Sequence, residues 1–175
     1  METSFYVLLG KALVIAMVFL NGCNLPLQNS TEVAPSFDLP NLEGKTVRLG
    51  DFRNKVVLLN FWGTTCAPCV REIPWLAEFQ RKYGSKGLQV VAISMYGEGP
   101  EELRPYVAKF GMEDLEVLIG NERVGTLFGV VAFPTTFIID QEGRLSSKHQ
   151  GLINRSEVET EFAALLNRGE TPQDH

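Results

Sequence analysis

Two cysteines three positions apart, Cys66 and Cys69, follow an apolar stretch and open a segment with helical spacing. Residues 56–61 (Val-Val-Leu-Leu-Asn-Phe) are nearly all apolar, as expected of a strand that is covered on both faces in a parallel sheet. Unsatisfied N–H groups and the helix dipole stabilise a thiolate at the first turn of a helix, which lowers the pKa of a thiol placed there. This pattern predicts a helix-mounted dithiol that closes and reopens a disulfide.

A static disulfide and half of a zinc site are the alternatives to a redox-active pair. Structural zinc takes four Cys or His ligands, usually at short spacing. The remaining candidates are Cys23, His149 and His175, all far from the pair along the chain. Redox chemistry is therefore the favoured interpretation, and we expect neither a metal nor any cofactor beyond the Cys66–Cys69 disulfide.

The first 23 residues are expected to be a signal sequence that is not part of the fold. Ala12 to Leu20 is an unbroken apolar run, too short to cross a bilayer but suited to the core of a secretory signal. Residues 20–23 (Leu-Asn-Gly-Cys) resemble the bacterial lipoprotein box, which makes Cys23 the candidate lipidation site. An uncleaved anchor, or an ordinary signal in which Cys23 is incidental, remains an alternative.

We therefore expect an exported domain that is held at the membrane by a lipid or an N-terminal anchor. It would face the periplasm or the outer side of the cell membrane, where disulfides persist. Residues 24–34 are predicted to form a polar tether, residues 35–168 the folded domain and residues 169–175 a frayed tail.

Composition excludes one class of partner. The chain is 45% hydrophobic and 21% charged, which is typical of a globular protein, and its net charge is −5. No cluster of lysines and arginines occurs, so we expect no binding to nucleic acid.

Hydrophobic spacing and turn residues predict strands that alternate with helices. The expected strands are 36–39, 46–49, 56–61, 88–94, 115–119, 135–140 and 144–150, and the expected helices are 66–83, 100–110, 121–128 and 156–167. Pro74 is expected to kink the first helix because it removes a backbone hydrogen bond. The order predicts an α/β sandwich around a mixed central sheet, preceded by an N-terminal β-hairpin.

Two motifs in this order resemble the thioredoxin fold. Residues 60–69 (Asn-Phe-Trp-Gly-Thr-Thr-Cys-Ala-Pro-Cys) contain the dithiol, and residues 133–140 (Phe-Pro-Thr-Thr-Phe-Ile-Ile-Asp) follow downstream. More narrowly, the chain resembles the membrane-anchored thiol–disulfide oxidoreductases of the TlpA/ResA type over residues 35–168. The resemblance implies a thioredoxin-like sandwich, with an extra helical insertion at residues 100–110.

The resemblance also assigns roles to residues. Cys66 would be the attacking thiol at an exposed helix tip, and Cys69 the resolving thiol one turn further in. Phe133–Pro134 would be a cis peptide facing the disulfide, with backbone that pairs with substrate. Glu72 lies near Cys69 around the helix and would be a partly buried carboxylate that exchanges protons with the cysteines. A solvated Glu72 paired with Arg71 is the alternative.

Residues beside the motifs are candidates for substrate contact. Thr65 stands where many relatives have Trp, so we expect the bulky Phe133 to supply the missing apolar surface next to Pro134. Trp62 is expected to form part of the active-site floor and to contribute to substrate binding. Asn60 stands where thioredoxin has a buried Asp, so that base is missing and Glu72 is the nearest replacement. His149 is expected to be a strand residue and not a ligand.

The leading hypothesis is a reductase of protein disulfides. Pro68 precedes the second cysteine and the ring contains no His, which favours a potential nearer thioredoxin's, about −270 mV, than DsbA's, about −120 mV. The resemblance implies reduction of apocytochrome c cysteines, as in cytochrome c maturation, or of other exported proteins. A transmembrane donor would supply the electrons.

Two further functions fit a thioredoxin-like fold less well. A peroxiredoxin-like peroxidase carries Pro and Thr or Ser seven and three positions before its reactive Cys, but this chain has Leu59 and Gly63 there. A copper-binding, chaperone-like protein would use both thiolates, which suit Cu(I), and add a His ligand. His149 is the only candidate for that ligand.

Overall fold

The computed structural model describes residues 32–169 of the chain. The expectations for the signal at residues 1–23, for lipidation of Cys23 and for residues 170–175 lie outside the described residues. Within residues 32–169, none of the helices combines the length and apolar character that crossing a bilayer requires.

A five-stranded mixed sheet forms the centre of the domain, in the order β5-β4-β3-β6-β7. Strands β3 (Val56–Trp62), β4 (Leu88–Ser94) and β5 (Glu116–Ile119) run parallel to one another. Strand β6 (Thr135–Ile139) is antiparallel to β3, and β7 (Leu145–Gln150) is antiparallel to β6. The predicted mixed sheet of an α/β sandwich is confirmed.

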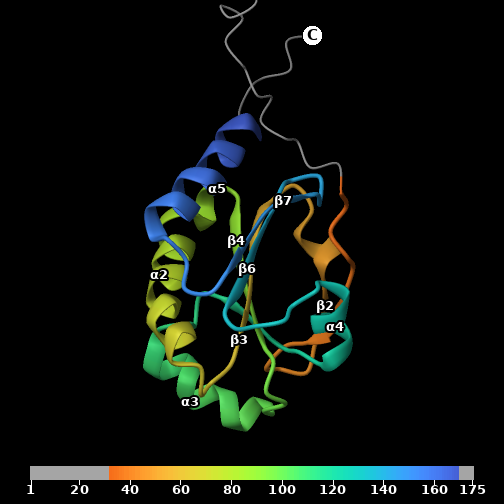
Figure 1. Cartoon of the computed structure of the whole chain (residues 1–175), viewed down its shortest axis with the longest axis vertical. Helices are drawn as coiled ribbons and strands as arrows, with labels where there is room; N and C mark the ends of the chain where they lie inside the picture. Colours follow the sequence, from red (N-terminus) through yellow and green to blue (C-terminus); the bar gives the residue numbers. More distant parts are fainter. Residues whose placement is uncertain (1–31, 170–175) are drawn as a thin grey trace, which may run out of the picture.

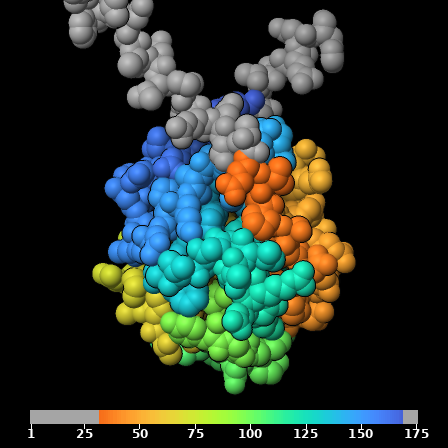
Figure 2. All heavy atoms as spheres, turned by 45° about the vertical axis from the view of Figure 1, so that its right-hand side comes forward, coloured from red at the N-terminus to blue at the C-terminus, as the bar shows by residue number. Residues whose placement is uncertain are grey.

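Layers of different kinds cover the two faces of this sheet (Figure 1). One face carries α2 (Ala67–Tyr83), α3 (Pro100–Phe110) and α5 (Arg155–Gly169). The other carries α4 (Glu122–Leu127) and a hairpin of β1 (Asp38–Pro40) and β2 (Thr46–Arg48). Figure 2 shows this N-terminal segment and the α4 region side by side on one surface of the molecule. The predicted N-terminal hairpin and the helix at residues 100–110 are both confirmed.

Strand β3 links the two cores because its side chains alternate between the faces. Val56, Leu58 and Trp62 belong to the core under α2, α3 and α5, whereas Val57, Leu59 and Phe61 belong to the core under the hairpin and α4. Asn60 lies on the first face and is the only polar residue of this strand.

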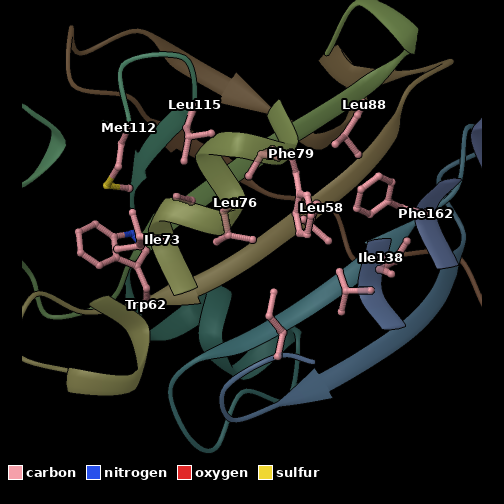
Figure 3. Packing of buried hydrophobic residues seen from close by; sticks show 14 of the residues in the cluster. Leu58, Trp62, Ile73, Leu76, Phe79, Leu88, Met112, Leu115, Ile138 and Phe162 are labelled. Atoms are coloured by element: carbon pink, nitrogen blue, oxygen red, sulfur yellow. The ribbon is translucent and has the colours of Figure 1, made fainter. Parts of the chain in front are cut away.

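Aromatic and branched side chains fill the core beneath α2 and α5. In Figure 3, Phe79 of α2 and Phe162 of α5 face each other close to Leu58. Their ring centroids are 5.1 Å apart in an edge-to-face arrangement, which aromatic pairs prefer. Trp62, Ile73 and Met112 lie together at the other end of the same core (Figure 3).

The ends of several elements differ from the expected ranges. Strand β2 stops at Arg48 because residues 49–52 form a 3-10 helix, η1 (Leu49–Phe52). A second 3-10 turn, η2 (Gly84–Lys86), follows α2, which is assigned as one helix through Pro74. Helix α5 extends to Gly169, one residue into the expected tail.

The folded part begins before position 35, where the tether was expected to end. Val33 forms an isolated antiparallel bridge with Arg144, and the Ala34 N–H donates to the Gly143 carbonyl at 2.9 Å. Ala34 is also buried in the second core. Backbone pairing with the β6–β7 turn therefore fixes these residues to the domain.

Leu76→Ala tests the core under α2. Leu76 is completely buried, so the truncation should lower the free energy of unfolding by about 2–5 kcal/mol. Leu127→Ala removes the same atoms from a side chain that is 47% exposed, and should change stability by less than about 0.5 kcal/mol. Urea titration of both variants with the disulfide intact gives the comparison, and equal losses would contradict this packing.

Candidate active site

The two cysteines of the motif form a disulfide at the start of α2. The S–S distance is 2.06 Å, and the Cα atoms are 5.2 Å apart. Cys66 is the N-cap residue of α2, and its Sγ accepts a hydrogen bond from the Cys69 N–H at 3.3 Å. Pro68 fits the first turn because the N–H that it lacks would have no partner within the helix. The predicted position of the pair is confirmed.

The two sulfurs differ in their access to solvent. Cys66 is 8% exposed and Cys69 is 0% exposed. The expected exposure of the helix tip is therefore too high, because Cys66 belongs to the buried core under α2. It remains the one cysteine of this pair that an external thiol can approach.

The second motif lies against the same core. The Phe133–Pro134 peptide is cis, as predicted. Pro134 is buried, and its carbonyl accepts a hydrogen bond from the Gly151 N–H at 2.8 Å. Phe133 is half-buried and packs against the core that contains both cysteines.

Tyr96 completes an aromatic surface that the sequence motifs did not indicate. Its ring packs edge-to-face on Phe133 with the centroids 5.6 Å apart, and it is 46% exposed. A Cβ atom at Gly63 would lie 2.6 Å from the Tyr96 ring, so glycine allows the ring to lie directly over the loop before Cys66. Tyr96 comes from the loop after β4, and only the folded sheet brings it here.

A carboxylate holds the loop that precedes the cysteines. The Thr64 hydroxyl donates to Glu98, and the Ser94 hydroxyl donates to the other oxygen of Glu98 at 2.8 Å. Partial burial raises the pKa of Glu98, but these hydrogen bonds outweigh it and the net pKa is lowered. An ionised Glu98 thus ties this loop to the end of β4. Thr65, the next residue, is exposed beside Cys66.

Trp62 lies beneath the site instead of lining it. Its side chain is 0% exposed and belongs to the core that includes Cys66 and Cys69. The expected position in the floor under the disulfide therefore fits. The expected contribution to substrate binding does not, because the buried ring has no surface that substrate can contact. Its Nε1–H has no hydrogen-bond partner among the described residues.

Glu72 is completely buried in the helix face that follows Cys69. One carboxylate oxygen accepts from Asn60 Nδ2 at 2.7 Å, and the other accepts from the Ile153 N–H at 3.1 Å. Burial raises the pKa of Glu72 to about 7, although the bonds from Ile153 and Asn60 pull it downward. A solvated Glu72 paired with Arg71 is therefore wrong.

Asn60 connects this carboxylate to the sheet. Its Nδ2 also donates to the Thr136 hydroxyl at 2.9 Å, while its Oδ1 has no partner within residues 32–169. Thr136 and Ile153 were not predicted as site residues. Both were missed because the topology, and not chain proximity, brings them to α2.

His149 is a strand residue, as predicted, and does not join the cysteines. It lies in β7, and its Nε2 is 3.0 Å from a carboxylate oxygen of Glu161. Within residues 32–169, no group of three potential metal-ligating side chains includes Cys66 or Cys69. In the part of the chain that the structure describes, His149 therefore does not join these two cysteines in such a group.

Comparison with known proteins agrees with this arrangement. A family model described as the AhpC/TSA family matches residues 31–148. The thiol-disulfide oxidoreductase ResA of Geobacillus thermodenitrificans is 34% identical over 132 residues, which cover 75% of each chain. The protein of the same name from Bacillus subtilis is 33% identical over 138 residues, covering 79% of this chain and 76% of the relative.

Solved structures show the same architecture. A putative thiol:disulfide interchange protein DsbE from Chlorobium tepidum superposes with a TM-score of 0.73 at 32% identity, covering 79% of this chain and 98% of that one. The exposed lipoprotein thioredoxin Etrx1 from Streptococcus pneumoniae gives a TM-score of 0.65 at 26% identity, covering 75% and 100%. The chain therefore belongs to the AhpC/TSA family of thioredoxin-fold proteins, and within it to the thiol–disulfide oxidoreductases of the ResA type.

Proposed function

We propose that this oxidoreductase works as a reductase of disulfides in exported proteins. The observation that carries the proposal is the difference in access between Cys66 and the fully buried Cys69 at the start of α2. A substrate sulfur can reach only the first of them. This asymmetry supports Cys66 as the attacking thiol and Cys69 as the resolving thiol.

The reaction consists of two exchanges that balance in atoms and electrons. The Cys66 thiolate attacks one sulfur of a substrate disulfide, which forms a mixed disulfide and releases the first substrate thiolate. The Cys69 thiolate then attacks the Cys66 sulfur, releasing the second substrate thiolate and closing the Cys66–Cys69 bond. The substrate gains two electrons, and a separate donor reduces the enzyme again.

Glu72 is the proton acceptor for the second exchange in this proposal. Cys69 lies in a core without solvent access, so its thiol proton needs an acceptor inside the protein. The Glu72 carboxylate is three residues further along the same helix, equally buried, and has a pKa of about 7. A base with a pKa near the working pH is well placed to take up and return a proton.

Substrate would bind over the disulfide beside the exposed Thr65, where the resemblance implies that Phe133 and Pro134 also face the cysteines. Phe133 and Tyr96 together supply an apolar surface where Thr65 offers none. The cysteines of apocytochrome c, implied by the resemblance to the TlpA/ResA type, are the first substrates to test.

The site of action in this proposal is the outer side of the cell membrane. Lipidation of Cys23, or an N-terminal anchor, would hold the domain close to a transmembrane electron donor. The similarity to a structure described as an exposed lipoprotein thioredoxin supports this placement. The absence of a His between the cysteines supports a reducing rather than a strongly oxidising potential.

Replacing the two cysteines separately tests the order of exchange. Cys69→Ser should accumulate mixed disulfides through Cys66, because nothing resolves them, and should abolish turnover in an insulin-reduction assay. Cys66→Ser should form no such adducts. Trapping in cells with Cys69→Ser should recover exported proteins, apocytochrome c among them. Adducts that form equally on Cys66→Ser would refute the assignment.

Glu72→Gln tests the buried carboxylate through the pH dependence of stability. The folded pKa of about 7 exceeds the ordinary value of 4.5, so the folded protein binds the proton more tightly than the unfolded chain does. The contribution of Glu72 to stability is then fully present below pH 4.5 and falls by up to about 3 kcal/mol as the pH rises from 4.5 through 7. Glu72→Gln should remove this decline between pH 4.5 and 7, the interval between the unfolded and folded pKa values, as measured by urea unfolding with the disulfide intact.

The same variant should slow resolution of a mixed disulfide by Cys69 and flatten the pH profile of that step. Glu78→Gln is the matched control, because Glu78 lies in the same helix but is exposed. A resolution rate that is the same in both variants would exclude Glu72 as the proton acceptor.

Phe133→Ala tests the apolar surface beside the disulfide. The truncation removes the ring that packs on Tyr96, so kcat/KM for insulin should fall by about tenfold, as expected for about 1.4 kcal/mol of lost contact. The rate with a small disulfide that does not reach this surface should change little. An unchanged rate with insulin would remove Phe133 from the substrate site.

A further inference from the structure

A second group of titratable side chains lies away from the disulfide, between β7 and α5. His149 Nε2 is 3.0 Å from an oxygen of Glu161, and the Ser147 hydroxyl donates to that same oxygen at 2.6 Å. Glu157 lies one helical turn before Glu161. One potential ligand atom from each of His149, Glu157 and Glu161 lies within 4.8 Å of the other two.

The charges around this group are unbalanced. The neighbouring Glu159 is paired with Lys82 at 2.7 Å, and Arg155 is paired with Glu78. In the described part of the chain, by contrast, Glu161 has His149 as its only ion-pair partner and Glu157 has none. Two carboxylates at positions i and i+4 of a helix repel each other, which disfavours α5 unless a cation lies between them.

We propose that His149, Glu157 and Glu161 bind a divalent metal ion of the zinc class, and that this ion joins β7 to α5. An imidazole nitrogen and two carboxylate oxygens are ligands that zinc accepts, with water in the remaining position. The group contains no thiolate, so it does not favour the soft ion Cu(I). The proposal is independent of the redox function and involves none of its residues.

The hydrogen bond between His149 and Glu161 already holds two of the ligand atoms 3.0 Å apart, close to the spacing that zinc requires. Zinc bonds of about 2.0–2.2 Å place tetrahedral ligand atoms about 3.4 Å apart. His149 and Glu161 are held near this separation, with side chains that are 17% and 33% exposed. Glu157 is exposed, so its carboxylate can turn inward to close the remaining distance. Ser147 orients Glu161 from outside the ligand set, as outer hydrogen bonds do in metal sites.

An ion at this place would also fix both ends of the segment that reaches the redox site. Residues 151–154 connect β7 to α5, and within them the Ile153 N–H donates to Glu72. Coordination of one ion by His149 and by the two α5 carboxylates would close this segment into a loop. The thermal stability of the whole domain should therefore rise when the ion binds.

The test is a calorimetric titration of the full chain with zinc chloride. Cys23→Ser is present throughout and the Cys66–Cys69 disulfide is intact, so that no thiol competes for zinc. We expect one zinc per chain, with affinity reduced by about tenfold or more in His149→Gln and in Glu161→Gln. His175→Gln makes the same change at the only other histidine and should leave the affinity unchanged.

Glu157→Gln provides a second test that does not depend on the buried ligands. Because Glu157 is exposed, this variant should fold normally, and its gain in melting temperature on addition of zinc should be smaller than the parent's. X-ray absorption of the zinc complex should show nitrogen and oxygen neighbours that include one imidazole. No saturable binding at millimolar zinc, equal affinity in all variants, or a sulfur neighbour would each overturn the proposal.

Discussion

Strand β3 is covered on both faces, and every residue from Val56 to Trp62 is buried. A central strand of this kind forces helices onto one face and the hairpin with α4 onto the other, because neither face can meet water. Burial of the whole strand also means that a polar side chain on it needs hydrogen-bond partners within the core. Asn60, the one polar side chain of the strand, must find partners inside the core, and its amide takes them from Glu72 and Thr136.

The dithiol and the buried carboxylate form one unit because both lie on the inner side of α2. Cys69, Glu72 and Ile73 all face the sheet, so the helix that presents Cys66 also brings a carboxylate into the core. Burial alone would favour the protonated form of Glu72, and the hydrogen bonds from Asn60 and Ile153 favour the ionised form. The balance gives a group that changes its charge near neutral pH.

Local patterns in the sequence predicted most of the fold and the reactive pair. The apolar runs at β3 and β4, the helix after Cys66 and the cis-proline motif depend on neighbours along the chain, and each is confirmed. Tyr96 and Glu98 were not foreseen, since both come from a loop that only the parallel pairing of β3 and β4 brings to the disulfide. Trp62 lies in the floor under the cysteines, as expected, but its complete burial leaves no surface for substrate, and a motif does not tell how deeply a side chain is covered.

The residues that form the redox centre are separated by very different numbers of positions along the chain. Closing the Cys66–Cys69 ring needs residues only three apart, so oxidation of the pair is possible in a short nascent segment. The surroundings of Glu72 need Ile153, which lies 81 positions further on. A chain that emerges from its N-terminus therefore acquires an oxidisable pair long before Ile153 can donate its hydrogen bond to Glu72. The buried surroundings of Glu72 are therefore complete only after the C-terminal third of the chain has been made.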